Sequence, residues 1–147
     1  MVDIACRSLD GRSPRPDSTE LESRDDSVKV HAWPNSAVYI MIKVTDKIAE
    51  HAARAAIQSL LDGAMALAMI GCEYYGCETL LKGGLFSEGT SPKFTVWNAN
   101  NHQVTWITLE STIKAVINYF QDHDIGSADF WIYDGQNKVG EGVISPF

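Results

Sequence analysis

The amino-acid sequence predicts an α+β fold: an antiparallel sheet with two helices on one face, built on a split βαβ (ferredoxin-like) core with an extra C-terminal hairpin. Three observations predict it. Two extended segments precede a long helical segment. A second, amphipathic helix follows another pair of extended segments. Two last extended segments then meet at Asp134-Gly135, a dipeptide typical of a hairpin turn.

The composition fits one soluble domain. The chain has 147 residues, which is long enough to bury a core without staples. Its net charge of −7 disfavours a nucleic-acid partner, which normally meets a basic face, and adhesion to anionic membranes. The longest apolar run, residues 63–70, is too short to cross a bilayer, so no membrane span is expected.

Residues 1–27 are predicted to be a flexible tail or pro-segment, and residues 28–147 the single α+β domain. The first segment is polar, contains Pro and Gly, and has little apolar surface with which to offset its ordering entropy. It lacks a hydrophobic stretch of the signal-peptide kind. The protein is therefore expected to be cytosolic, or secreted with its signal already removed.

The first two strands are read from hydrophobic patterning. Apolar and polar residues alternate over 28–32, which predicts a short strand. Pro34 interrupts the pattern because it lacks the N–H that a central strand needs. Residues 37–44 (AVYIMIKV) are nearly all apolar, as expected for a central strand.

The first helix is predicted from Lys47 to about Ile70, with Thr45 or Asp46 as its N-cap. The glycine-rich stretch that follows, residues 71–92, is predicted to be irregular apart from a short helical turn over 78–81.

Two further strands, 94–97 and 104–107, are predicted to face each other across a turn centred on Asn100-Asn101, since Asn tolerates a positive φ. The second helix follows, with Thr108 as its N-cap. Its apolar residues fall on one stripe: Leu109, Ile113, Val116, Ile117 and Phe120. Strands over 129–133 and 139–144 close the chain.

Aromatic residues are the main candidates for a binding site. Trp97, Trp106 and Trp131 are expected on three different strands, with Tyr133 near the last of them. Inside the protein they would be core; on the open face of the sheet they would form an interface or a ligand platform. The partner would be another protein, or a second copy of the chain packed through the sheet face.

No catalytic motif is present, and no cofactor or metal site is predicted. The four histidines are scattered and show no metal-ligand spacing. If the fold were a dimeric α+β barrel, His31 with Tyr39 would be the acid–base pair.

Cys72 and Cys77 are five positions apart at the end of the first helix. They would form a small-loop disulfide in an oxidising compartment, or remain two buried thiols. The spacing is not CxxC, so it supports neither a thioredoxin motif nor a zinc half-site. Cys6 is left over.

The second half of the chain also resembles a known group of proteins. The motifs are residues 106–110 (WITLE), 130–135 (FWIYDG) and 139–144 (VGEGVI), and they are similar to the C-terminal half of small secreted proteins of filamentous fungi. Residues 19–26 (TELESRDD) resemble the processed pro-region of such proteins. The resemblance implies secretion and an α+β sandwich like that of killer-toxin-like effectors, and it carries over no active site.

Together these features favour a small secreted fungal binding protein, effector- or toxin-like, without catalysis of its own. The alternative is a small dimeric α+β barrel enzyme or ligand-binding protein with a pocket on the open sheet face. The expected location is extracellular, or cytoplasmic if the cysteines are free.

Overall fold

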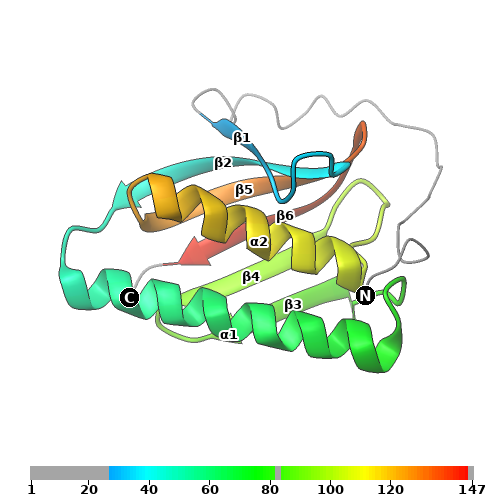
Figure 1. Ribbon diagram of the computed structural model, residues 1–147, viewed down its shortest axis with the longest axis horizontal. Helices are drawn as coiled ribbons and strands as arrows, with labels where there is room; N and C mark the ends of the chain where they lie inside the picture. Colours follow the sequence, from blue (N-terminus) through cyan, green and yellow to red (C-terminus); the bar gives the residue numbers. More distant parts are fainter. Residues whose placement is uncertain (1–26, 82–83, 146–147) are drawn as a thin grey trace.

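The computed structural model describes residues 27–81 and 84–145, and these form an α+β domain (Figure 1). The chain order is β1 (Val28–His31), β2 (Val38–Lys47), α1 (His51–Tyr75), β3 (Leu85–Gly89), β4 (Lys93–Asn98), α2 (Trp106–Asp122), β5 (Gly126–Asp134) and β6 (Asn137–Ser145). The six strands make one sheet in the order β1-β2-β5-β6-β4-β3, with every neighbouring pair antiparallel. The predicted fold class is confirmed at this level.

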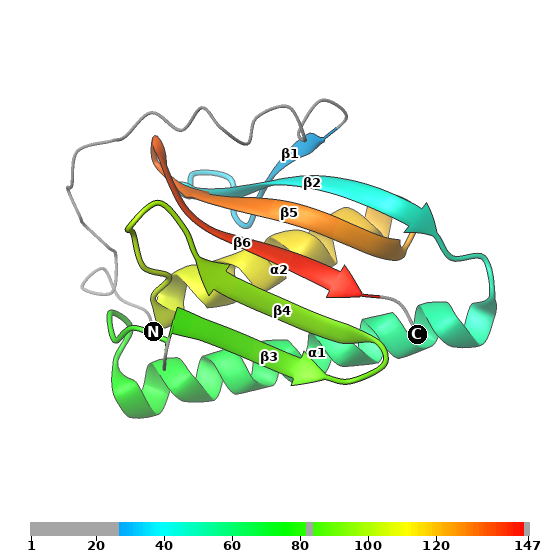
Figure 2. The ribbon, with the colours of Figure 1, turned by 180° about the vertical axis from the view of Figure 1, so that it is seen from behind.

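Both helices lie on the same side of the sheet. Figure 1 shows α2 crossing in front of the central strands, while α1 runs along the β3 border. Figure 2, seen from behind, shows a sheet face over which neither helix passes. The sheet therefore has a helix-covered face and an opposite face, called the open face below.

The split βαβ core is not confirmed. The β5–β6 hairpin lies between β2 and β4, so it forms the middle of the sheet and is not an added edge. Its strands are buried along most of their length, and the most apolar strands of a sheet belong at its centre. The hairpin turns at the predicted place, where Gly135 has a φ of +68°.

The predicted start of the first helix is wrong. β2 continues through Thr45 and Asp46 to Lys47, because this end of the strand stays paired with β5 across a bulge. Glu50 is the N-cap and makes no side-chain capping bond. The helix also runs further than predicted, to Tyr75, and ends at Gly76, whose φ of +87° suits glycine.

The segment before α2 also differs from prediction. Residues 104–107 do not form a strand, since Thr105 is the N-cap of α2 and accepts a hydrogen bond from the Thr108 N–H at 3.2 Å. Thr108 itself lies inside the helix. The Asn100-Asn101 turn is confirmed by positive φ values of 55° and 62°. It joins β4 to the helix, and β4 pairs with β3 and β6 instead.

The stretch of residues 71–92, predicted to be irregular because of its glycines, contains the strand β3. The predicted helical turn over 78–81 is absent; Leu80 forms an isolated bridge with Thr105 instead. This bridge ties the end of α1 to the start of α2.

The core fills the space between the sheet and the helices. Its largest fully buried side chains come from every layer: Ile40, Ile42, Ile57, Leu61, Phe94, Val96, Leu109, Ile113, Phe130, Ile132 and Ile144. Phe94 and Phe130 stack with ring centroids 5.7 Å apart. A Cβ on Gly142 would lie 2.3 Å from the Phe130 ring, so bare backbone on β6 makes room for that ring.

By length and composition alone, α1 is apolar enough to cross a membrane, and the expected absence of a span stays a prediction. Within its most apolar stretch, 33% of the residues are buried in the protein. Core helices of soluble proteins pass the same test of length and composition, so the finding is weak evidence for a span.

Candidate functional site

Strand pairing determines which side chains reach the open face. Residues opposite each other on neighbouring strands share a face, and successive residues alternate. Ile40, Ile42, Phe130 and Ile132 belong to the core, so their neighbours along the strands point the other way. The open face comprises Lys29, His31, Tyr39, Met41, Lys43, Leu85, Ser87, Lys93, Thr95, Trp97, Asp129, Trp131, Tyr133, Lys138, Glu141 and Val143.

One row of the open face crosses all six strands. From β1 to β3 it reads Lys29, Met41, Trp131, Glu141, Trp97 and Leu85, each directly opposite the next. Trp131, on a central strand, is only 7% exposed, whereas Lys29 and Leu85 at the two ends are exposed. The row is thus closely packed at its centre and open at both sheet edges.

The second row is an aromatic ladder on β1, β2 and β5. The rings of His31 and Tyr39 lie 5.3 Å apart, and those of Tyr39 and Tyr133 are stacked at 5.0 Å. The Lys29 ammonium sits 4.4 Å from the centre of the Tyr39 ring, within range of a cation–π interaction. The faces of these rings are therefore occupied by one another and by the Lys29 ammonium.

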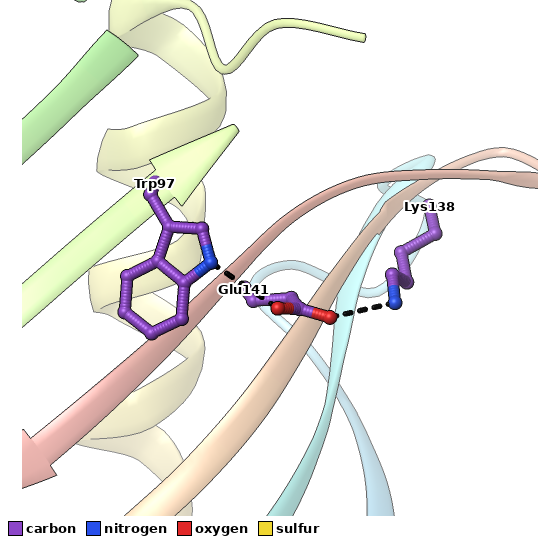
Figure 3. Close-up of polar contacts among 3 residues, drawn as sticks. All are labelled: Trp97, Lys138 and Glu141. Atoms are coloured by element: carbon purple, nitrogen blue, oxygen red, sulfur yellow. Dashed lines mark hydrogen bonds and ion pairs between the residues drawn. The ribbon is translucent and has the colours of Figure 1, made fainter. Parts of the chain in front are cut away.

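A polar network occupies the middle of the open face (Figure 3). The Trp97 indole N–H donates to one carboxylate oxygen of Glu141 at 3.2 Å, and the Lys138 ammonium donates to the other at 2.7 Å. Lys138 is only 3% exposed, so its charge requires this counter-charge. Glu141 is thereby held between an aromatic ring and a buried cation.

The structure gathers most of the predicted site residues. Trp97, Trp131, Tyr133, His31 and Tyr39 all lie on the open face. Of the predicted aromatic residues, Trp131 and Tyr133 are buried and Trp97 is half-buried, yet none of the three belongs to the core cluster between the sheet and the helices.

Trp106 is the exception. It is the first residue of α2, on the covered side of the sheet, and was wrongly expected on a strand. Its ring packs edge-on against Phe86 and stacks with Tyr75. A Cβ on Gly71 would lie 2.4 Å from this ring, so Trp106 is where the two helices meet closely.

The polar network was not foreseen from the sequence. Trp97 and Glu141 become neighbours only through the pairing of β4 with β6, two strands far apart in the chain. The available signal was the pair of opposite charges Lys138 and Glu141, three residues apart in the closing strand, since a lysine is rarely buried without a partner.

His31 and Tyr39 meet through their rings, and the His31 Nδ1 atom lies 3.2 Å from the carbonyl oxygen of Ser36. The geometry shows ring packing in place of a shared proton. Among the described residues, no group of three or more His, Cys, Asp or Glu side chains is placed to hold a metal ion.

The sulfur atoms of Cys72 and Cys77 lie 2.8 Å apart, which is contact and not the roughly 2.05 Å of a covalent disulfide. A bond between them stays a prediction. Cys6, and with it the tail or pro-segment predicted over residues 1–27, lies outside the described residues except for Ser27.

Two hollows lie away from the open face. One, of about 790 Å³, is at the C-terminal end of α2, where Lys47 and Asp124 form an exposed ion pair at 3.3 Å. The other, of about 260 Å³, lies between the helices and is lined by Leu61, Ile117 and Phe120. Neither includes a residue predicted for the site.

Comparison with known proteins gives no further guide. No family model matches the chain, and no match was found among curated proteins or solved structures.

Proposed function

We propose that this protein is a small non-catalytic binding module that docks a protein partner on its open face. The observation that carries the proposal is the row of side chains across all six strands, with Trp131, Glu141 and Trp97 at its centre. Protein interfaces concentrate aromatic residues and Met at a well-packed centre and place polar groups at the rim.

The rim fits the same description. Lys29 and Lys93 are exposed, Lys43 is half-exposed, and all three lie around the aromatic centre. Because the ladder rings already stack on one another, the face is better suited to a flat protein surface than to a base or sugar that needs a free ring.

A retention experiment tests the proposal. The wild-type chain, a face variant (Lys29→Glu with Thr95→Arg) and a control variant (Gln58→Arg with Lys114→Glu) are immobilised and exposed to extracellular fluid of candidate hosts. In each variant one lysine becomes glutamate and one neutral residue becomes arginine, so the net charge changes equally. The control substitutions lie on the helices. The expected result is a protein retained by the wild type and control and lost from the face variant. Equal retention by all three would refute the assignment.

Secretion and an effector- or toxin-like role are part of the proposal. They are supported by the resemblance to small secreted fungal proteins. Intact mass after alkylation under denaturing conditions tests the compartment. A pair that resists alkylation until reduced supports an oxidising location, and three alkylated cysteines in the protein taken from its natural source would favour the cytoplasm.

The second candidate is a dimeric α+β barrel enzyme or ligand-binding protein, which the contact of His31 with Tyr39 favours. It requires two copies to enclose a pocket between their open faces, in the manner of ferredoxin-like sheets. Native mass spectrometry distinguishes the two candidates. A co-purifying small molecule that is lost in His31→Ala and Tyr39→Phe would support the barrel.

A further inference from the structure

Exposed apolar side chains are concentrated at one border of the molecule. Nine large hydrophobic residues in the described part of the chain are exposed, and all but Val28 and Trp33 lie on the C-terminal half of α1, in the segment that follows it, or at the start of β3. These seven, called the α1–β3 border, are Leu67, Met69, Ile70, Tyr74, Tyr75, Leu80 and Leu85. Tyr74 is the most open, at 77% exposed.

Three of these residues form a stripe that flanks the sheet. Leu67, Ile70 and Tyr74 follow the i, i+3, i+7 spacing of one helix side. Gly63 lies one turn earlier on that side, and a Cβ there would be 3.5 Å from the Glu88 carboxylate on β3. The stripe therefore borders β3, as the course of α1 along that strand in Figure 1 shows.

β3 is an edge strand. Within the described residues it pairs only with β4, so its other side offers backbone N–H and C=O groups for pairing. At the opposite edge of the sheet, β1 carries the exposed side chains of Lys29 and His31, and a lysine at an edge disfavours pairing with another chain. β3 (LFSEG) has neither lysine nor proline, and its one charge, Glu88, points toward α1.

We propose that a second copy of this chain docks on the α1–β3 border, with the two β3 strands paired antiparallel about a two-fold axis. The pairing brings the apolar stripes of the two α1 helices together beside the joined strands. It is isologous, since each copy presents the same edge and the same stripe. Leu85 is also the last residue of the open-face row, so the border adjoins the open face at β3.

The exposed apolar area of the α1–β3 border is consistent with a second copy of the chain as its occupant. Taking about 150–250 Å² for a whole aromatic side chain and a similar area for a whole aliphatic one, the exposed fractions of Leu67, Ile70 and Tyr74 amount to roughly 300 Å², and those of all seven residues to roughly 600 Å². The seven face more than one side of the helix. Together they reach the upper limit for a monomer's largest patch, about 300–600 Å², and remain below the roughly 800 Å² per partner of a stable interface. Strand pairing supplies the rest. Glu73 is the only charge between Ala64 and Tyr75, so little of the −7 net charge opposes contact.

The proposed dimer would have a functional geometry. An axis that relates two antiparallel neighbouring strands stands perpendicular to the sheet, so both open faces point to the same side. The result is one continuous twelve-stranded sheet, twice the six strands of one copy, with all helices behind it. Two linked binding faces raise the apparent affinity for a multivalent partner.

The test compares the oligomeric state of the full chain and two variants by sedimentation over a wide concentration range. Ile70→Lys with Tyr74→Lys alters the stripe. Ala52→Lys with Ala55→Lys places the same charges on the exposed N-terminal half of the same helix. Both variants lower the net negative charge, so electrostatic repulsion between copies is reduced equally. Circular dichroism and thermal unfolding establish that each variant is folded.

The expected result is a dimer for the wild type and control, and dimerisation weaker by roughly tenfold or more in the stripe variant. Backbone amides over 85–89 should gain protection from hydrogen exchange as the concentration rises. A wild type that is monomeric at every concentration overturns the proposal. A dimer that persists in the stripe variant but dissociates in the face variant (Lys29→Glu with Thr95→Arg) also overturns it, and would point to the barrel arrangement. Dimerisation only after removal of residues 1–26 also overturns it, because the chain's own N-terminal segment would then be the occupant.

Discussion

Tyr39 on β2 and Tyr133 on β5 stack face to face, with ring centroids 5.0 Å apart and ring planes 3° apart. Such a pair is stabilising beyond the area it buries and fixes both rings. The aromatic layer of the open face is therefore ordered in the protein alone, which would lower the entropy lost in the proposed binding.

Glu141→Gln should destabilise the protein by about 2 kcal/mol, because the buried Lys138 ammonium would lose the carboxylate charge that lies 2.7 Å from it. The cost is below that of a fully enclosed pair, since the Glu141 side chain is 27% exposed. Urea unfolding measures it, with exposed Asp62→Asn as the control expected to change little. Adding Lys138→Met to Glu141→Gln should recover part of the loss; no recovery would mean that the ion pair is not the cause.

Gly63 and Gly71 should respond oppositely to alanine, although both lie within α1. Gly63→Ala should stabilise by about 0.5–1 kcal/mol, because its Cβ would meet only the Glu88 carboxylate at 3.5 Å and alanine favours the helix. Gly71→Ala should destabilise by roughly 1–3 kcal/mol, because its Cβ would fall 2.4 Å from the Trp106 ring. Thermal unfolding of the two variants side by side is the measurement. A gain at both positions would mean that Trp106 can move aside.

Burial raises the pKa of Glu110 on α2 above its ordinary value of 4.5. A carboxyl with a raised pKa in the folded state is most favourable to folding below the unfolded pKa, and that contribution is lost as pH rises through the folded pKa. Glu110→Gln should therefore be more stable than wild type at pH 7. The difference should shrink as pH falls toward 4. Unfolding free energies at a series of pH values test this, and a difference that grows in acid would contradict it.

Thr105→Ala should cost about 1 kcal/mol, because the alanine cannot accept the hydrogen bond from the Thr108 N–H that caps α2. Thr105→Ser retains an acceptor and is the matched control. Urea unfolding measures both. Equal stability of the serine and alanine variants would show that the cap contributes nothing.

Patterning was sufficient for the fold class because the apolar runs of β2 and β5 and the stripe of α2 have clear periods. Boundaries were harder. β2 runs past Thr45 because cross-strand pairing with Ser127 and Gly126 outweighs local capping chemistry. β3 was missed because its five residues lie among glycines and are stabilised by pairing with β4.

The order of the strands in the sheet could not be predicted from the sequence, for a related reason. The hairpin signal at Asp134-Gly135 is local, but the insertion of that hairpin between β2 and β4 depends on long-range pairing. The candidate site divides in the same way. His31, Tyr39, Trp97, Trp131 and Tyr133 could be selected by residue type, whereas their rows, and the place of Glu141 within them, arise from the register of the sheet.

The two faces of the sheet place different demands on evolution. Helix-side residues such as Ile42 and Phe130 are constrained by packing, while open-face residues such as Lys29 and Thr95 stand one backbone layer away from that interior. Successive positions along a strand are thus divided between those that determine folding and those that the proposed binding would use. If the proposal holds, a lineage could change the partner of this surface, residue by residue, while the helix-side packing remains unchanged.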